Sequence, residues 1–292
     1  MNSREEILGR LLRSFPVRYL VKAFDTKGWK QEDVIEELLE TNNEANILAF
    51  VSENFDVTKQ SVFIYAISNN YQHKKLIKNA DLECVILDQN LNNGIFTLKG
   101  FHQIKYDVKL FEDTLIETDL KFIQPFKLTI MEGYIIIAIT KMEANIKTFY
   151  PTGTLVLNHS KEDIESNLIN RILTFFDVNH NVRPQQADLN KGIKELWEAD
   201  VIDGKELSFR EASSRTKVVM DGEKLYKEKY PKRYANIMRK PLELCIFRYL
   251  GDDEDYPSHF RCEPANGRIS FSLYSTNINQ INNVLNGIIG NN

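Results

Sequence analysis

The chain has 292 residues, 42% of them hydrophobic and 11% aromatic, and a formal net charge of −4. This length and composition are typical of a globular protein with a sizeable core and more than one structural unit, and a pI near 5.8 excludes a globally basic nucleic-acid-binding protein. No stretch reaches the roughly 18 apolar residues of a membrane span, and the first residues lack the apolar run of a secretory signal, so we expect a cytoplasmic protein without membrane contact.

Residues 1–56 are predicted to form a small helical bundle that acts as an interaction domain. Ser3 and Glu6 have the spacing of a capping box at the start of a first helix, and Pro16 separates that helix from a second one. Apolar residues at helical spacing predict two more helices, Gln31–Glu40 and Glu44–Glu53. Four short amphipathic helices can share one core, and we expect this domain to bind a protein partner through a helix face.

The run LLRSFPVRYLVKAF, Leu11–Phe24, resembles the helical start of the kinetochore protein centromere protein N, in which a leucine-rich helix breaks at a proline before the next helix. The likeness is confined to this stretch of two helices. We carry no function over from it.

The third predicted helix is acidic, with five carboxylates: Glu32, Asp33, Glu36, Glu37 and Glu40. Such a run usually forms a solvated helix face. The alternative is an acidic docking surface.

Residues 57–158 are predicted to form an antiparallel β-rich region. Runs of β-branched and aromatic residues predict strands at Val62–Ile67, Cys84–Leu87, Gly94–Leu98, Ile104–Leu110, Leu115–Ile123, Phe126–Ile130 and Tyr134–Ile139. Asn93, Gly94 and Gly133 supply residues that tolerate the positive φ of tight hairpin turns. The last of these strands is apolar on both faces, so we expect it to be central and covered on both sides, with a helix among the covering elements.

A metal-dependent nuclease is an alternative interpretation of this region. Restriction-type nucleases place an Asp and an Asp/Glu-x-Lys motif on adjoining strands, where two carboxylates hold Mg²⁺ and the lysine helps to orient the attacking water. Asp88 followed by Asp107-Val108-Lys109 matches this pattern, as does Asp113 followed by Asp119-Leu120-Lys121. Solvent-facing strand residues are the competing interpretation, because a chain with 27% charged residues contains such triplets by chance.

Residues 159–292 are predicted to alternate helices and strands. We expect a helix at Lys161–Phe176, a loop at Asn179–Gln186, a helix at Asp188–Glu198, strands at Leu242–Leu250, Ser258–Cys262 and Arg268–Tyr274, and a closing helix at Asn277–Ile289. The fold class is therefore α+β: a small N-terminal helical bundle followed by an antiparallel β-rich body with C-terminal helices.

The segment 205–240 is basic in an otherwise acidic chain, with eleven Lys or Arg against five Asp or Glu. It also contains tyrosines, so it can contact phosphates while offering rings to stack on bases. Pro231 interrupts it, which predicts a strand or loop that leads into two short helices. The candidate nucleic-acid contacts are Arg210, Arg215, Lys217, Lys224, Lys227, Tyr230, Lys232, Arg233, Tyr234, Arg239 and Lys240.

Patterns typical of enzymes are weak in this chain. The cysteines Cys84, Cys245 and Cys262 lack paired spacing, so we expect buried reduced thiols and neither disulfides nor a zinc site. The histidines are scattered, and His180, in a predicted loop, is the most plausible general base. The four carboxylates of Gly251–Asp255 lack the spacing of a calcium loop and predict a solvated hairpin tip.

We therefore expect a non-catalytic binding protein that contacts nucleic acid or another polyanion through its basic segment and needs no cofactor. Magnesium is involved only if the nuclease interpretation holds, and a pure protein-protein adaptor is a further alternative. The competing explanation of the basic segment is that its cations pair with the acidic N-terminal helices, within one chain or across a homo-oligomer. An immune or antiviral role would suit such an architecture.

Overall fold

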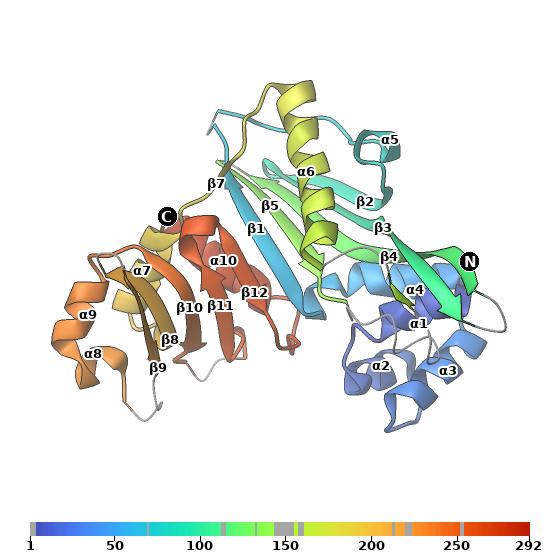
Figure 1. The fold of residues 1–292 in the computed structure, drawn as a ribbon, viewed down its shortest axis with the longest axis horizontal. Coiled ribbons are helices and arrows are strands. Elements are labelled where there is room, and N and C mark those ends of the chain that lie inside the picture. The colour runs from blue at the N-terminus through green and yellow to red at the C-terminus, as the bar shows by residue number, and fades with distance from the viewer. Residues whose placement is uncertain are drawn as a thin grey trace.

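A computed structural model describes residues 4–68, 70–111, 115–131, 133–142, 155–156, 161–211, 214–219, 224–251 and 254–292. Within this part of the chain, helices form the N-terminal end, an antiparallel sheet forms the body and a helix closes the chain (Figure 1). The predicted α+β fold class is confirmed.

The N-terminal helices share one core with part of the sheet. They are α1 (Arg4–Leu12), α2 (Val17–Phe24), α3 (Gln31–Thr41) and α4 (Glu44–Glu53). Their buried leucines and Phe15 pack together with Phe101 and Met142 of the β-rich region. Asn43 caps α4 by accepting a hydrogen bond from the Asn46 amide at 2.9 Å. Ser3, the predicted cap of the first helix, lies outside the described residues.

One antiparallel sheet runs through the rest of the described chain. Its strands are β1 (Gln60–Ala66), β2 (Val85–Asn92), β3 (Ile95–Phe111), β4 (Leu115–Met131), β5 (Tyr134–Thr140), β6 (Leu155–Val156), β7 (Gln185–Gln186), β8 (Ile202–Glu211), β9 (Ser214–Val219), β10 (Leu242–Tyr249), β11 (His259–Glu263) and β12 (Arg268–Phe271). The main path has the order β2-β3-β4-β5-β1-β12-β11-β10-β8-β9, with β6 paired to β3 and β7 paired to β1. The described edges of this path are β2 and β9.

The early strand β1 lies in the middle of this sheet. Its residue Gln60 is opposite Thr140 of β5 on one side and Phe271 of β12 on the other. β1 therefore joins the strands of the β-rich region to those of the C-terminal region in a single hydrogen-bonded layer.

Helices cover both faces of β5, as the sequence predicts. Ile135, Ile137 and Ile139 share a core with the long helix α6 (Lys161–His180), and Ile136 and Ala138 share a second core with the closing helix α10 (Gln280–Gly290). Figure 1 shows α6 along the sheet near β1 and β5. The remaining described helices are α5 (Asn79–Leu82), α7 (Asn190–Glu198), α8 (Tyr226–Lys229) and α9 (Pro231–Ile237), with the 3-10 turns η1 (Phe55–Val57) and η3 (Pro264–Asn266).

β3 and β4 are longer than predicted, because Gly100 and Pro125, which are predicted to lie between separate strands, do not end the strand pairing. β3 continues through Gly100, where a Cβ would lie 2.7 Å from the Val85 carbonyl oxygen, so glycine permits the close approach of β2. β4 continues through Pro125, which pairs only with β3 because the pairing with β5 begins at Phe126. A proline is tolerated where its missing N–H faces no partner strand.

The first predicted hairpin turn is confirmed, whereas the end of the long helix differs from the prediction. Asn93 and Gly94 both adopt positive φ, 51° and 80°, as a tight hairpin turn requires. His180 is not in a loop but is the last residue of α6, where its ring lies 5.1 Å from that of His73. The helix is thus about one turn longer than predicted, and the His180 ring lies against the rings of Tyr71, Phe175 and Phe176.

Two buried histidines predict an acid-sensitive fold. Burial lowers the pKa of His73 and of His102 from 6.5 to about 4. Between these values the unfolded chain binds protons that the folded protein does not, so stability falls as the pH falls from 6.5 toward 4. We expect a loss of about 2–3 kcal/mol per histidine between pH 7 and pH 4.5, measured as the free energy of unfolding in urea.

A matched variant isolates this effect. His73 is surrounded by Phe96 and Phe176, so His73→Phe keeps the ring contacts and removes the titrating group. The difference in the free energy of unfolding between pH 7 and pH 4.5 is expected to be smaller in this variant than in the parent protein. An unchanged difference would show that His73 is not neutral in the folded protein.

Candidate nucleic-acid interface

The excess positive charge of the basic segment lies in its second half. Residues 205–223 contain as many carboxylates as cations, whereas residues 224–240 contain seven Lys or Arg against Glu228 alone. We call residues 224–240 the basic end. It comprises α8, α9 and the residues that flank them. The two short helices predicted for this segment are therefore confirmed.

The first half of the segment forms a hairpin at the described edge of the sheet. β8 and β9 pair antiparallel, with Arg210 opposite Arg215 and Ser208 opposite Lys217. The side chains of Arg210, Arg215 and Lys217 lie outside the described part of the structure.

Several candidate contacts in the basic end are exposed. Lys224, Lys232, Arg233 and Arg239 are exposed, and the Tyr230 side chain, 38% accessible, lies with its ring 5.7 Å from the Lys229 ammonium. Exposed cations beside an accessible ring are the combination that can contact a phosphate and stack on a base.

Three other candidates are engaged inside the molecule. Lys227 pairs with Asp200, and Lys240 is partly buried with its ammonium 5.6 Å above the Phe209 ring. Tyr234 packs edge-on against Trp197, with ring centroids 4.9 Å apart. Of the two candidate tyrosines, Tyr230 and Tyr234, Tyr230 therefore has the ring that is accessible for stacking.

Asp203 holds the basic end against the sheet. Its carboxylate, 2% exposed, accepts hydrogen bonds from Trp197 Nε1 at 3.1 Å, from the Tyr226 amide at 3.2 Å and from Arg248 Nη2 at 3.0 Å. Arg248 also donates to the Lys224 carbonyl at 3.4 Å. One buried carboxylate thus fixes the first turn of α8 and compensates a cation at the same time.

Aromatic packing completes this anchor. Tyr226 is fully buried, and its ring lies 5.7 Å from that of Trp197 and 5.6 Å from that of Tyr230. Burial raises the pKa of Tyr226 and of Tyr234, so both phenols stay neutral at physiological pH. The Lys and Arg side chains alone therefore set the positive charge of the basic end.

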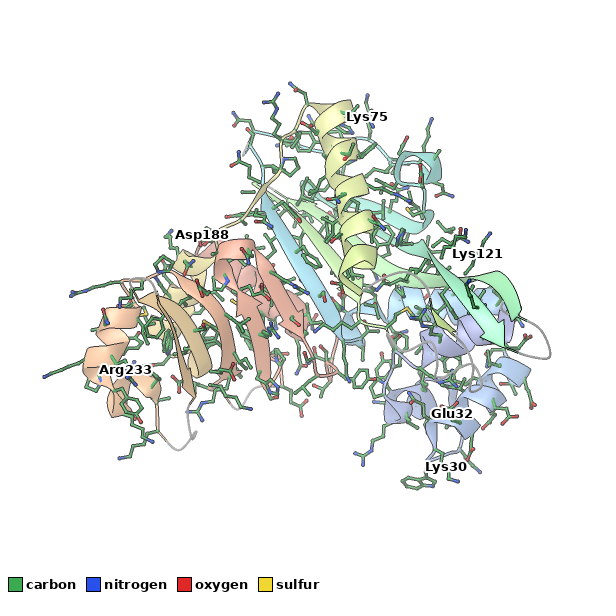
Figure 2. All side chains as sticks on the ribbon, viewed as in Figure 1. Lys30, Glu32, Lys75, Lys121, Asp188 and Arg233 are labelled. Carbon is green, nitrogen blue, oxygen red and sulfur yellow. The ribbon has the colours of Figure 1, made fainter. Side chains whose placement is uncertain are left out.

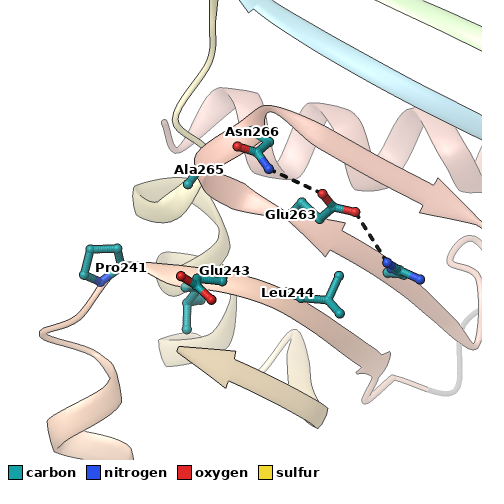
Figure 3. A pocket seen from close by; sticks show the side chains of 8 residues that line it. Pro241, Glu243, Leu244, Glu263, Ala265 and Asn266 are labelled. Carbon is teal, nitrogen blue, oxygen red and sulfur yellow. Dashed lines mark hydrogen bonds and ion pairs between the residues drawn. The ribbon is translucent and has the colours of Figure 1, made fainter. Parts of the chain in front are cut away.

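A cavity of about 600 Å³ follows the basic end on β10 and β11 (Figure 3). Pro241 and Glu243 line one side, and Glu263 lines the other. Glu263 accepts a hydrogen bond from Asn266 at 3.4 Å and pairs with Arg261 at 3.5 Å. Arg261 also lines the cavity, so its described lining carries two carboxylates and one cation.

The acidic N-terminal helices do not neutralise the basic end within one chain. α3 and α9 lie at opposite ends of the molecule, as the labels Glu32 and Arg233 show in Figure 2. Glu32 instead accepts a hydrogen bond from Arg13 Nε at 3.2 Å. Pairing between the two regions would require a second copy of the chain.

The strand register separates the residues of the nuclease alternative. Asp88 lies opposite Lys99 of β3, whereas Asp107 lies eight positions further along that strand, opposite Asp119. At about 3.3 Å per residue, this separation is about 26 Å, so Asp88 does not meet Asp107 and Lys109. The side chains of Asp107 and Asp119, and Asp113 as a whole, lie outside the described residues.

The other predicted sites have mixed outcomes. Cys84, Cys245 and Cys262 are buried free thiols, as predicted. Among the described residues, no group of three or more His, Cys, Asp or Glu is placed to hold a metal ion. The acidic tip is only partly described, because residues 252–253 are outside the described ranges.

Two structural features are missed by sequence reasoning. Asp203 reads as an ordinary charged residue, because nothing in the sequence shows that three donors converge on it. Trp29 is 95% exposed between α2 and α3, and its signal is a tryptophan in the turn sequence Lys27-Gly28-Trp29-Lys30.

No helix in the described ranges is both long enough and apolar enough to span a membrane. Comparison with protein-family models finds no match, and no curated protein matches the chain.

Proposed function

We propose that this protein binds nucleic acid through the basic end, without catalysing a reaction on it. The observation that carries the proposal is the exposure of four cations at one end of the molecule, far from the acidic α3: Lys232 and Arg233 on α9, and Lys224 and Arg239 in the residues that flank the two short helices. Neutralising phosphates with such cations releases condensed counterions, which is the main source of sequence-independent affinity.

The contacts that anchor α8 and α9 indicate that the basic end is a fixed surface and not a flexible tail. The Asp203 hydrogen bonds and the buried Tyr226 hold the helices in one position, so the cations lose little additional conformational freedom on binding. Tyr230 adds an accessible ring between the two short helices. Base stacking on such a ring is sequence-tolerant, and we therefore expect little sequence preference.

Salt dependence tests the proposal directly. We expect the affinity for a fluorescein-labelled DNA duplex, measured by fluorescence anisotropy, to fall roughly a hundredfold between 50 and 200 mM salt, as about four phosphate contacts require. The variant with Lys224, Lys232, Arg233 and Arg239 all changed to Glu is expected to lose binding at 50 mM salt. Absence of binding by the parent protein at 50 mM salt would contradict the proposal.

The matched control changes the same number of exposed cations elsewhere. Lys74, Lys75, Lys78 and Arg183 are exposed, and the label Lys75 in Figure 2 lies far from that of Arg233. Their joint change to Glu alters the net charge equally and is expected to reduce affinity only modestly. An equal loss in both variants would show that net charge, and not the basic end, controls binding.

A further inference from the structure

A cavity of about 300 Å³ lies between the sheet and the closing helix α10. Aliphatic side chains form its apolar walls: Ile95, Met131, Ile136, Ala138, Ile281 and Leu285. Asn286 also lines the cavity and, like Ile95, is exposed, so the cavity reaches the surface. An apolar cavity of this size with a few polar groups is the usual form of a binding site for a small organic molecule.

A partly buried ion pair lines this cavity. Lys127 Nζ lies 2.9 Å from each carboxylate oxygen of Asp56, and the two side chains are only 14% and 12% exposed. No other residue of the described lining is ionised, so the two charges balance. Lys99, opposite Lys127 on β3, donates to the Ser52 carbonyl at 2.8 Å instead. A ligand with one charge would meet a partner and a like charge together, whereas a zwitterion can pair with both.

The Lys127 ammonium retains a hydrogen-bonding position for a ligand carboxylate. It has three N–H donors, and two of them bond the Asp56 oxygens. The third lies toward Asn282 Oδ1 at 3.4 Å, which is longer than the usual range. A ligand carboxylate would accept a shorter, charge-assisted bond from it. Asn282 and Asn286, one turn apart on α10, line the same cavity and carry further amide donors.

Gln60 has the opposite requirement, an acceptor that needs a donor. Its Nε2 donates to the Phe55 carbonyl at 3.0 Å, which fixes the amide orientation, and among the described residues its Oε1 has no hydrogen-bond donor. Gln60 is fully buried and lines the cavity. Phe55 precedes Asp56 in η1, so the two acceptors lie at the same end of the cavity. Buried acceptors without a donor are rare and costly, and a ligand ammonium would supply the missing donor.

We propose that the cavity binds an aliphatic α-amino acid. Its carboxylate accepts a hydrogen bond from Lys127, its ammonium donates to Asp56 and to Gln60 Oε1, and its side chain packs against the apolar walls. An aliphatic amino acid combines these three groups in one small molecule, whereas the ammonium and the carboxylate of a peptide lie at opposite ends of its chain. The cavity lies on different elements from α8 and α9, so this binding goes beyond the proposed contact with nucleic acid and does not depend on it.

Isothermal titration calorimetry with L-leucine tests the proposal, and we expect saturable binding. Two analogues keep the branched side chain and each lack one charged group: isocaproate lacks the ammonium, and isopentylamine lacks the carboxylate. Each is expected to bind roughly ten- to hundredfold more weakly, because it loses charge-assisted hydrogen bonds. Equal affinity for L-leucine and for either analogue would overturn the proposal, as would absence of binding by L-leucine, L-isoleucine and L-methionine.

A charge change in the lining locates the site. Asn286→Asp keeps the size of an exposed side chain and places a carboxylate in the cavity wall, so L-leucine binding is expected to weaken roughly tenfold through repulsion of the ligand carboxylate. Asn279→Asp is the matched control, because it makes the same charge change at an exposed position just before α10 and outside the described lining. It is expected to leave the affinity unchanged. Equal losses in the two variants would overturn the assignment to this cavity.

The cavity and the basic end can be tested separately. The variant with four glutamates in the basic end keeps every residue of the described lining, so it is expected to bind L-leucine as the parent protein does. L-leucine binding by a parent protein that does not bind DNA would support the amino-acid site and overturn the proposed function. DNA binding without L-leucine binding would overturn the amino-acid site and leave the proposed function standing.

Discussion

Replacing Asp203 by alanine is expected to lower the free energy of unfolding by about 3–5 kcal/mol and to weaken nucleic-acid binding with it. The substitution leaves Arg248 partly buried without the carboxylate that pairs with it at 3.0 Å, and it removes the acceptor of Trp197 Nε1 and of the Tyr226 amide. Urea unfolding followed through the emission of Trp197 measures the stability change. Anisotropy at low salt measures the binding change.

Asp200 provides the control for Asp203. It also pairs with a lysine of the basic end, Lys227, but it is exposed. Asp200 has φ of 58°, a backbone conformation that asparagine tolerates and alanine does not. Surface ion pairs contribute about 0–1 kcal/mol, so Asp200→Asn, which removes the charge and keeps this tolerance, is expected to have little effect on stability. Equal effects of the two substitutions would contradict the role of Asp203 as the anchor of α8.

Replacing Gly192 by alanine is expected to destabilise the protein by about 3 kcal/mol, at the upper end of the usual cost of overpacking. A Cβ at this position of α7 would lie 2.0 Å from the Ile288 carbonyl oxygen of α10. The obstacle is backbone and cannot rotate away, so the two helices must separate. Differential scanning calorimetry measures the loss as a lower Tm.

Gly290 is the matched control for Gly192, because a Cβ there meets no atom within 4 Å. It is the last residue of α10, and Gly290→Ala is expected to be neutral or slightly stabilising, since alanine restricts the unfolded chain more than glycine does. A loss of stability at Gly290 equal to that at Gly192 would show that helix separation is not the cause.

Local features of this fold are predictable from the sequence. The two-faced burial of Tyr134–Thr140 follows from its uninterrupted apolar residues, and the turn at Asn93 and Gly94 follows from their tolerance of positive φ. These predictions depend on residues that are neighbours in the chain. Strand order depends on distant partners, and no periodicity in Gln60–Ala66 indicates that β1 pairs with β12.

The candidate site also has features that the sequence predicts and features that depend on distant contacts. The positive charge of the basic end is visible in the sequence, but which cations are exposed depends on packing against residues far along the chain. Tyr230 and Tyr234 are alike in sequence, and only the contact of Tyr234 with Trp197 distinguishes them. The separation of Asp88 from Asp107 likewise depends on strand register, which a three-residue motif does not encode.

The central position of β1 has a consequence for how the protein is made. β5 is synthesised soon after β1, with which it pairs, but β12, which pairs with Gln60–Phe63 on the other edge of β1, follows β5 by about 130 residues. Before β12, β7 is available on that edge for Tyr65 and Ala66 alone. At the usual rate of translation, this interval is on the order of ten seconds. We therefore expect the nascent chain to present Gln60–Phe63 as an open strand edge during that time, and an open edge can template aggregation.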